Sequence, residues 1–544
     1  LMKISTLKSR VLAILASGAL VATVVVAAPA NAAATGPTCD GKTPVQTCSG
    51  TTSDGALYTM QVPSDWNGTA LLYSHGYGFI IDIPAGVPVV GGTKVDNSAY
   101  AGPDAASNAA LVKAGYAIMG SGFARQGWNI DSAVKTNVEL VGVFKKQFPK
   151  VSKVIAWGRS GGAFITQSLA EKYPTLVDGV AMACPVLGTV EAELDMALDF
   201  LWGLKTFFDP TIKGGNYSAG AAGVGEAITD LVKMFTVIGK LQASISTNAW
   251  PDTSKVPDSM KAIPPRSALL LVGLMAGIPT KSTSFDSTTG PEGPLKLSWP
   301  LAIAPAMAIL ENGAQGAALA ILATHDLELQ TGGAFYDNSK TDYAARVADE
   351  AVTFNAALSG NTALNGLLSY LNPMNPAAPR LVGNPAALAK LRALSTHTGK
   401  ISVPTVVLAG ETDVISPAGN TQWLIDRYDE QYAAEKAAAM KLLGGSYKAP
   451  SKKLIVIWKT GADSYSKFTA AGSPIALLPS DPNSNAHCNY SAAQHLALIN
   501  LTAKGIAKGS VSYDGATRTI ARKVMSGVIG PQRFPALQKY YMDK

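Results

Sequence analysis

The sequence predicts an α/β fold: a mostly parallel sheet with helices on both faces and a large helical insertion. Strand and helix patterns alternate from about residue 70 to 184, which is typical of a parallel sheet covered on both sides. The alternation then stops over residues 188–398 and resumes afterwards. Since loops beyond about 15 residues are uncommon in compact domains, we expect the interruption to be a folded insertion.

Length and composition agree with this organisation. The chain has 544 residues, of which 47% are hydrophobic and 15% charged, enough apolar material for a large core. We expect a signal peptide at 1–32, the first part of the sheet domain at 33–187, a helical lid at 188–398 and the second part at 399–544. The net charge is only +7, and no basic stripe is interleaved with aromatics, so a nucleic-acid partner is not expected.

The first 32 residues have the pattern of a signal peptide. Basic side chains precede an apolar run over residues 11–28, and Ala30-Asn31-Ala32 offers small residues for cleavage. This predicts a secreted protein, with a retained membrane anchor as the alternative. Farther along, residues 267–279 come closest to the roughly 18 apolar residues that span a bilayer. Their length suits a buried helix better, so we expect no membrane span in the mature chain.

The elements before the insertion follow in order. The segment Asp65-Trp66-Asn67-Gly68 has turn chemistry and separates two early strands. A later helix is stopped by Pro174. The predicted strands are 52–63, 69–74, 115–120, 154–157 and 177–183, and the predicted helices are 131–148 and 163–173.

Fewer elements can be predicted after residue 188. Helical patterns occur at 222–241, 301–310 and 342–358, inside the proposed lid. The sheet resumes with strands at 403–409 and 453–458. A helix follows at 492–504, where Ser491 and Gln494 form a capping signature.

The segment Gly158-Arg159-Ser160-Gly161-Gly162 is the only G-x-S-x-G in the chain. A β-branched strand runs into it and a helix runs out of it, which is the context of a nucleophile elbow. The turn is sharp, so small residues must flank the serine. Ser160 is therefore the candidate nucleophile. The alternative is a glycine-rich turn that only packs a helix on the sheet.

A serine hydroxyl needs a neighbouring base to become a nucleophile. Of five histidines, His487 lies in the loop between the last sheet strand and the final predicted helix. A loop in that position can return to the nucleophile, so His487 is the candidate base and His325, in the insertion, is the alternative. His75 and His495 are expected to have structural roles.

An acid must orient that imidazole and stabilise its charged form. Asp413 lies just past the strand that follows the insertion, after Gly410-Glu411-Thr412. It is the candidate acid. Glu411 is its nearest rival, and an aspartate that merely caps a turn is the alternative.

Two backbone N–H groups are expected to bind the oxyanion of a tetrahedral intermediate. Gly161 follows the nucleophile directly and supplies one of them. The segment His75-Gly76-Tyr77-Gly78 follows an early strand, and its glycines allow close approach of the backbone. The N–H of Tyr77 is therefore the second candidate donor.

The order Ser160, Asp413, His487, with a His-Gly loop upstream, resembles the α/β-hydrolase superfamily over about 50–187 and 400–508. The pair His487-Cys488 and the long insertion are similar to tannases and feruloyl esterases. Those enzymes carry a cysteine directly before the nucleophile, where this chain has Arg159. The chain also resembles secreted actinobacterial esterases and amidases with a large lid.

These observations predict a secreted serine hydrolase that cleaves carboxylic esters through an acyl-enzyme and requires no cofactor. Residues 264–322 are poor in charge, which favours a small or polymeric substrate with an apolar acyl group. An exopeptidase or amidase of the same fold is the alternative enzyme. A non-catalytic binding protein of this fold is the alternative from another class.

The exported part contains four cysteines, Cys39, Cys48, Cys184 and Cys488. An even number in an oxidising compartment favours disulfides. Cys39 and Cys48 can close a short loop, while the strand before Cys184 and the loop carrying Cys488 are expected at the same sheet edge. We therefore predict the pairs Cys39–Cys48 and Cys184–Cys488, with two buried free thiols as the alternative to the second. The sequence contains no C-x-x-C and no H-x-x-x-H pattern, so a structural zinc site is not expected.

Overall fold

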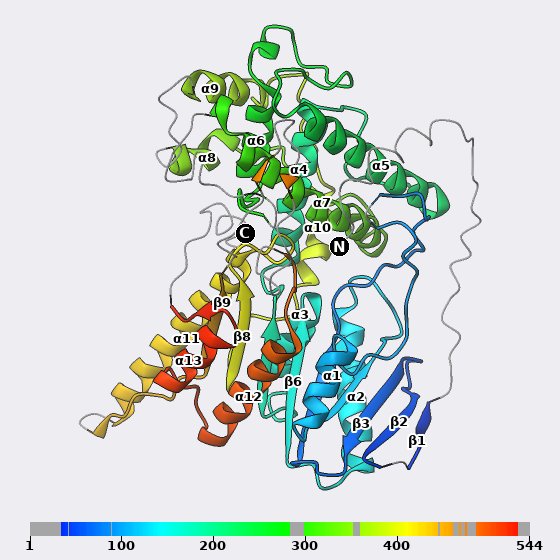
Figure 1. The fold of residues 1–544 in the computed structure, drawn as a ribbon, viewed down its shortest axis with the longest axis vertical. Coiled ribbons are helices and arrows are strands. Elements are labelled where there is room, and N and C mark those ends of the chain that lie inside the picture. Colours follow the sequence, from blue (N-terminus) through cyan, green and yellow to red (C-terminus); the bar gives the residue numbers. More distant parts are fainter. Residues whose placement is uncertain are drawn as a thin grey trace.

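A ten-stranded sheet forms the lower half of this computed structural model, in the order β1-β2-β3-β5-β4-β6-β7-β8-β9-β12 (Figure 1). The structure describes residues 34–41, 43–88, 90–282, 285, 299–351, 360–443, 446–460, 467–468, 474–475 and 486–530. The strands are β1 (Thr35–Cys39), β2 (Val45–Thr51), β3 (Leu57–Pro63), β4 (Thr69–Ser74), β5 (Ala117–Ser121), β6 (Lys153–Arg159), β7 (Gly179–Ala183), β8 (Thr405–Gly410), β9 (Leu454–Lys459) and β12 (Gly527–Val528). A separate pair consists of β10 (Lys467–Phe468) and β11 (Pro474–Ile475).

The middle of the sheet is parallel. Strands β5, β4, β6, β7, β8 and β9 pair in parallel from one neighbour to the next. The chain enters through the antiparallel strands β1, β2 and β3, and β12 closes the far edge antiparallel to β9. Since parallel strands share one carboxyl edge, the loops after β4, β6, β7 and β8 meet at that edge, where β9 also ends.

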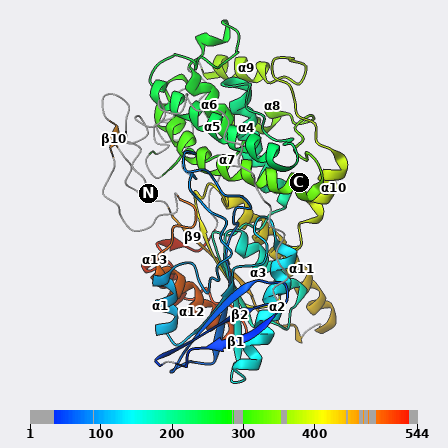
Figure 2. The ribbon, with the colours of Figure 1, turned by 90° about the vertical axis from the view of Figure 1, so that its right-hand side faces the viewer.

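Side chains alternate between the two faces of the sheet and build two cores. In β4, Leu72 faces one core and Leu71 the other, and in β6 Ala156 and Ile155 divide in the same way. This is the period-two pattern of a strand that is buried on both faces. Figure 2 shows the resulting layers. One face is covered by α2 (Ile130–Gln147), α3 (Gly161–Lys172) and α11 (Ala418–Leu443), and the other by α1 (Ala105–Lys113), α12 (Ala492–Lys508) and α13 (Gly515–Lys523).

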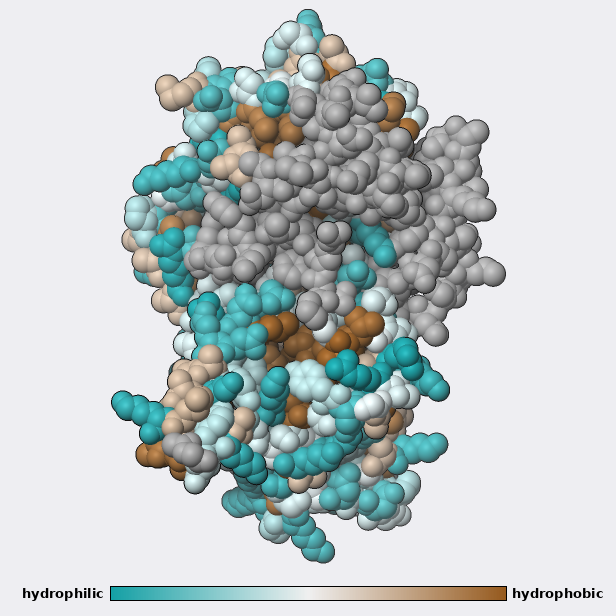
Figure 3. Space-filling view, turned by 90° about the vertical axis from the view of Figure 1, so that its left-hand side faces the viewer, coloured by the Kyte–Doolittle hydropathy of each residue, from teal (hydrophilic) through white to brown (hydrophobic). Residues whose placement is uncertain are grey.

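Between β7 and β8 the chain forms helices, which we call the helical insertion (residues 190–393). It lies above the sheet in Figure 1. Figure 3 shows apolar side chains gathered on one face of the molecule at the level between the sheet half and the insertion. The helices are α4 (Val190–Phe207), α5 (Gly220–Ser244), η3 (Met260–Ala262), α6 (Pro265–Met275), η4 (Trp299–Leu301), α7 (Ile303–Thr331), α8 (Tyr343–Ala351), α9 (Gly360–Tyr370) and α10 (Pro385–Ala393).

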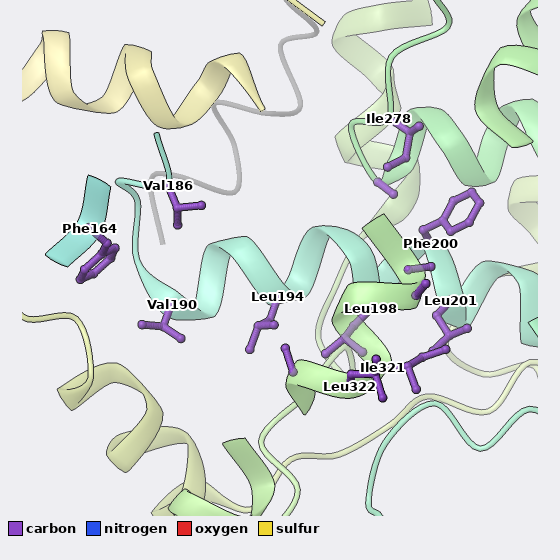
Figure 4. Packing of buried hydrophobic residues seen from close by; sticks show 14 of the residues in the cluster. Phe164, Val186, Val190, Leu194, Leu198, Phe200, Leu201, Ile278, Ile321 and Leu322 are labelled. Atoms are coloured by element: carbon purple, nitrogen blue, oxygen red, sulfur yellow. The ribbon is translucent and has the colours of Figure 1, made fainter. Parts of the chain in front are cut away.

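The insertion has an apolar interior that is continuous with one core of the sheet. Val190, Leu194 and Leu198 lie along one side of α4, and Leu198 meets Ile321 and Leu322 of α7 (Figure 4). Because these side chains are buried together, α4 and α7 are held as a rigid pair.

The predicted α/β class is confirmed, and most predicted elements are present with ends shifted by a few residues. The capping box at Ser491 and Gln494 is also present at the start of α12. Part of the predicted helix 342–358 and the predicted signal peptide lie outside the described residues.

The prediction that residues 267–279 come closest to a membrane span was wrong. The helix expected at 301–310 is α7, which has 29 residues. Its length and composition, not those of residues 267–279, come closest to a membrane span, yet 72% of its most apolar window is buried. This burial, together with its packing against α4, makes α7 the core helix of the insertion. Isolated polar residues, such as Asn312 and His325, interrupt its apolar sequence.

Candidate active site

Ser160 occupies a sharp turn between β6 and α3. Its backbone has φ 54° and ψ −128°, a region that non-glycine residues rarely adopt. A Cβ atom on Gly162 would lie 2.0 Å from the carbonyl oxygen of Ser74, and one on Gly158 would lie 2.3 Å from that of Gly162. The sequence Gly-x-Ser-x-Gly is therefore required by the space around this turn. Such a turn directs the serine side chain to the carboxyl edge of the sheet.

The loop after β4 lies directly against Ser160. A Cβ atom on Gly76 would be 3.1 Å from Ser160 Cβ and 3.5 Å from its Oγ, and one on Gly161 would be 3.3 Å from the backbone nitrogen of Tyr77. The two candidate oxyanion donors, Tyr77 and Gly161, are thus neighbours beside the serine. This is the arrangement that an oxyanion hole requires.

His487 and Asp413 are joined by a hydrogen bond. The Nδ1 atom of His487 lies 2.9 Å from Asp413 Oδ1 and 3.0 Å from Oδ2. The carboxylate is 1% exposed and also accepts the backbone N–H groups of Ile415 at 2.9 Å and Ser416 at 2.8 Å. Since a carboxylate can only accept, the Nδ1–H of His487 is the donor, and in the neutral imidazole Nε2 is then the unprotonated nitrogen. Asp413, rather than its rival Glu411, therefore holds this imidazole.

No hydrogen bond joins the Ser160 hydroxyl to His487 among the described residues. The Nε2 atom of His487 instead lies 3.3 Å from Cys488 Sγ. In enzymes without substrate, such contacts are often long and tighten only in the complex. The structure thus brings the candidate acid and base together.

Two links tie the loop of His487 to the strands around Ser160. The Arg159 guanidinium donates to the carbonyl oxygen of Cys488. Cys488 also forms a disulfide with Cys184, just past β7. Both cysteines have positive φ, 43° for Cys184 and 53° for Cys488, so backbone strain is concentrated around the site. Both predicted disulfides are present, since Cys39 pairs with Cys48 in the β1–β2 hairpin.

The remaining histidines lie away from Asp413. His325, the alternative base, is buried in α7 beside Tyr217, and burial lowers its pKa. The Nδ1 atom of His495 lies 2.8 Å from Ser107 Oγ, within hydrogen-bond distance, and burial lowers the pKa of His495 to about 4. His75 lies against the rings of Tyr100 and Phe123.

Glu193 is a further carboxyl group near the site that the sequence did not reveal. It lies in the first turn of α4, and its Oε1 atom is closed off from solvent. Burial raises the pKa of Glu193 to about 8; the Asn420 amide lowers it, and the negative charge of Asp413 adds to the rise. Glu193 is therefore mostly protonated at neutral pH and adds little negative charge beside Asp413.

One group of potential metal ligands occurs in the described part of the chain. Atoms of Cys184, His487 and Cys488 lie within 4.8 Å of one another. The two sulfurs are bonded to each other, so neither is a thiolate that could bind a metal. This group is therefore better understood as the support of the imidazole.

Comparison with known proteins finds likenesses to esterases and amidases. No family model matches the chain. A segment of 134 residues, 24% of the chain, is 28% identical to o-phthalyl amidase from Xanthobacter agilis and spans only 25% of that protein. Feruloyl esterase B from Aspergillus oryzae is 12% identical, with 90% of this chain and 86% of that chain covered and a TM-score of 0.37. Tannin acyl hydrolase from Aspergillus niger is 11% identical, with 88% of this chain and 82% of that chain covered and a TM-score of 0.33.

The fold itself is assigned from the sheet and its loops. A mostly parallel sheet carries the serine on the strand–turn–helix of β6 and α3, and the acid and histidine follow later in the chain. This order and this elbow are those of the α/β hydrolases. On these grounds, the chain has the α/β-hydrolase fold.

Proposed function

We propose that the chain is a secreted serine hydrolase that cleaves carboxylic esters through an acyl-enzyme. The observation that carries the proposal is the hydrogen bond between His487 and the buried Asp413, at the sheet edge where Ser160 sits in its strained turn. A histidine that is held by a buried carboxylate, in a chain that also carries an elbow serine, supports a role in acyl transfer.

In the proposed reaction, Ser160 Oγ attacks the substrate carbonyl while Nε2 of His487 takes its proton. Asp413 stabilises the imidazolium that forms. The proton then passes to the leaving alcohol, which departs and leaves an acyl group on Ser160. Water repeats the sequence in the second half: His487 removes its proton, the acid is released, and the proton returns to Ser160.

The developing oxyanion would be held by the backbone N–H groups of Tyr77 and Gly161. Their closeness to each other and to Ser160 supports this role. Each such donor contributes about two to three powers of ten to kcat in serine hydrolases.

We propose esters ahead of amides, because the charge-poor segment 264–322 of the insertion would suit an apolar acyl group. Amide hydrolysis is the second candidate, because the matched segment of o-phthalyl amidase belongs to an amidase. We further propose that the helical insertion acts as the lid of the site. Two disulfides support an oxidising, extracellular location.

A substrate panel tests the proposal. Wild-type protein and Ser160→Ala are assayed on aryl esters of increasing acyl length, aryl amides and aminoacyl anilides. We expect turnover of esters, with Ser160→Ala folded but inactive, because removal of a partly exposed hydroxyl leaves no sizeable cavity. Turnover of amides alone would replace the ester assignment, and full activity of Ser160→Ala would exclude the serine mechanism.

A further inference from the structure

Helix α7 of the insertion reaches the loop that carries the candidate oxyanion donor. The hydroxyl of Tyr77 donates to Oδ2 of Asp326 at 3.3 Å. Asp326 is 3% exposed. A buried carboxylate of the insertion therefore contacts the residue whose backbone nitrogen lies beside Gly161.

Asp326 joins a second loop at the same point. Its Oδ2 atom also accepts the backbone N–H of Trp128 at 2.7 Å, and Oδ1 accepts the Gln330 amide at 2.9 Å. Residue 127 must be glycine for the carboxylate to fit, because a Cβ atom there would lie 2.4 Å from Asp326 Oδ2. The φ of Gly127 is +79°, which also favours glycine. The N–H of Gly127 in turn donates to the carbonyl oxygen of Gly78 at 2.9 Å. One carboxylate thus fixes both loops against α7.

The pKa shifts of Tyr77 and Asp326 are compatible with a hydrogen bond from the Tyr77 hydroxyl to Asp326. Burial raises the pKa of Asp326, while its hydrogen bonds from Trp128, Gln330 and Tyr77 and the charge of Arg125 lower it. Burial, followed by the negative charge of Asp326, raises the pKa of Tyr77 well above its ordinary value. Tyr77 therefore keeps its proton and remains a donor.

We propose that Asp326 is a positioning residue that holds the Tyr77 backbone N–H in place for the oxyanion. This inference rests on the proposed serine-hydrolase function and extends it, because it makes the helical insertion part of the oxyanion hole. The insertion then acts on the chemical step as well as covering the site. Loss of Asp326 lets the Tyr77 loop move while the substrate-binding surfaces remain.

The test uses three variants and a matched control in the full-length protein. Asp326→Ala removes the link. Asp326→Asn keeps an oxygen that accepts from Tyr77 and Trp128, provided that the Gln330 side-chain amide rotates to accept from the new NH2 group. Tyr77→Phe removes only the hydroxyl. The control is Glu328→Gln, two residues along α7, because Glu328 also holds two backbone N–H groups (Asn216 at 2.6 Å and Tyr217 at 2.7 Å) but within the insertion.

We expect Asp326→Ala to lower kcat about ten- to a hundredfold with KM nearly unchanged, since misplacement by about 1 Å costs up to that much. The affinity for an alkylboronic acid, which forms a tetrahedral anion on serine, should fall by the same factor. Asp326→Asn should restore most of kcat. Adding Asp326→Ala to Tyr77→Phe should cost less than the product of the two single effects, since both changes break one contact. Glu328→Gln should lower thermal stability and leave kcat intact.

Several results would overturn the inference. They are a kcat of Asp326→Ala within about threefold of wild type, a change in KM alone, an equal loss in Glu328→Gln, or an Asp326→Asn variant as impaired as Asp326→Ala. If Asp326→Ala does not fold, Tyr77→Phe takes its place: its kcat should fall at nearly constant KM while Asp326→Asn keeps most of kcat, and a kcat of Tyr77→Phe within about threefold of wild type would overturn the inference. Failure of the proposed function is distinguishable, because wild-type protein would then hydrolyse neither esters nor amides.

Discussion

At the residue scale, the site depends on glycines, because a side chain at these positions would overlap or crowd neighbouring atoms. Gly158 and Gly162 make the turn around Ser160 possible, and Gly76 and Gly161 let the Tyr77 loop approach it. These requirements are local, so a short motif in its strand–helix context reveals them. This is why Ser160 and its neighbours could be predicted from sequence.

Gly162→Ala is expected to distort the elbow. The new Cβ atom would lie 2.0 Å from the Ser74 carbonyl oxygen and 2.7 Å from that of His75, and backbone cannot move aside as a flexible side chain does. We expect a loss of about 2 kcal/mol or more in the free energy of unfolding, and a lower kcat, measured by denaturant titration and ester turnover.

The matched control is Gly142→Ala in α2, where a Cβ atom meets nothing within 4 Å. Alanine is the better helix former, so this variant should gain about 0.5–1 kcal/mol and keep full activity. Equal stability of the two variants would contradict the steric account of the elbow.

Other residues of the site could not be predicted because tertiary packing positions them. Asp326 and Glu193 lie in helices whose sequence shows only an apolar helical pattern with occasional polar residues. Their positions next to Tyr77 and Asp413 depend on how the insertion packs on the sheet. No local signal encodes that packing, whereas His487 and Asp413 follow predictable strands.

At the element scale, buried strands with a clear pattern were predictable, whereas the first edge strands and helix α11 were not. Strands β4, β6, β7, β8 and β9 are apolar and bounded by turns. The first strands, β1 and β2, are rich in Thr, Gly and Ser and lie at the sheet edge, where burial imposes little pattern. Helix α11 was missed because its long C-terminal part is exposed.

The loop of His487 is held by two links, and their loss should slow the chemical step. In a double variant, Cys184→Ser with Cys488→Ser, the histidine loop loses its covalent anchor to β7. We expect kcat to fall about tenfold at constant KM, and thermal stability to fall as well, since the disulfide closes a long loop. Both are measured at temperatures where the variant remains folded.

The control is the double variant Cys39→Ser with Cys48→Ser, which opens the disulfide of the edge hairpin. It should lose some stability and keep kcat. If both double variants had the same kcat as wild type, the Arg159 link would be sufficient and the disulfide would have no part in positioning His487.

At the scale of the whole molecule, the insertion and the sheet half meet around His397, on the connection from α10 to β8. Its ring packs 4.2 Å from that of Phe164 and 5.6 Å from that of Trp423. Neither ring nitrogen has a hydrogen-bond partner among the described residues. Burial lowers the pKa of His397 to about 4, although Glu171, 4.0 Å away, raises it.

The burial of His397 predicts that the folded protein loses stability in acid. The unfolded chain binds a proton at His397 below its ordinary pKa of 6.5, and the folded chain does so only near 4. Stability from this group is therefore complete above about pH 6.5 and is lost as the pH falls toward 4. The raised pKa of Glu193 acts in the opposite direction, because the stability that this group contributes is lost as the pH rises from 4.5 to about 8.

Thermal unfolding of wild type and His397→Leu at pH 7 and pH 5 checks this point. We expect the drop in Tm from pH 7 to pH 5 to be smaller in the variant, because the titrating group is gone. An identical drop in both proteins would show that His397 is not part of the acid response.

The central claim, that Ser160 is a nucleophile activated by His487 and Asp413, is tested most directly by covalent labelling. Wild-type protein is treated with a fluorophosphonate, digested and mapped by mass spectrometry. The account predicts one adduct, on the peptide that contains Ser160, with loss of turnover in step with labelling. It also predicts no adduct in Ser160→Ala and far slower labelling in His487→Ala. An unlabelled wild-type protein, or equal labelling of Ser160→Ala, would contradict it.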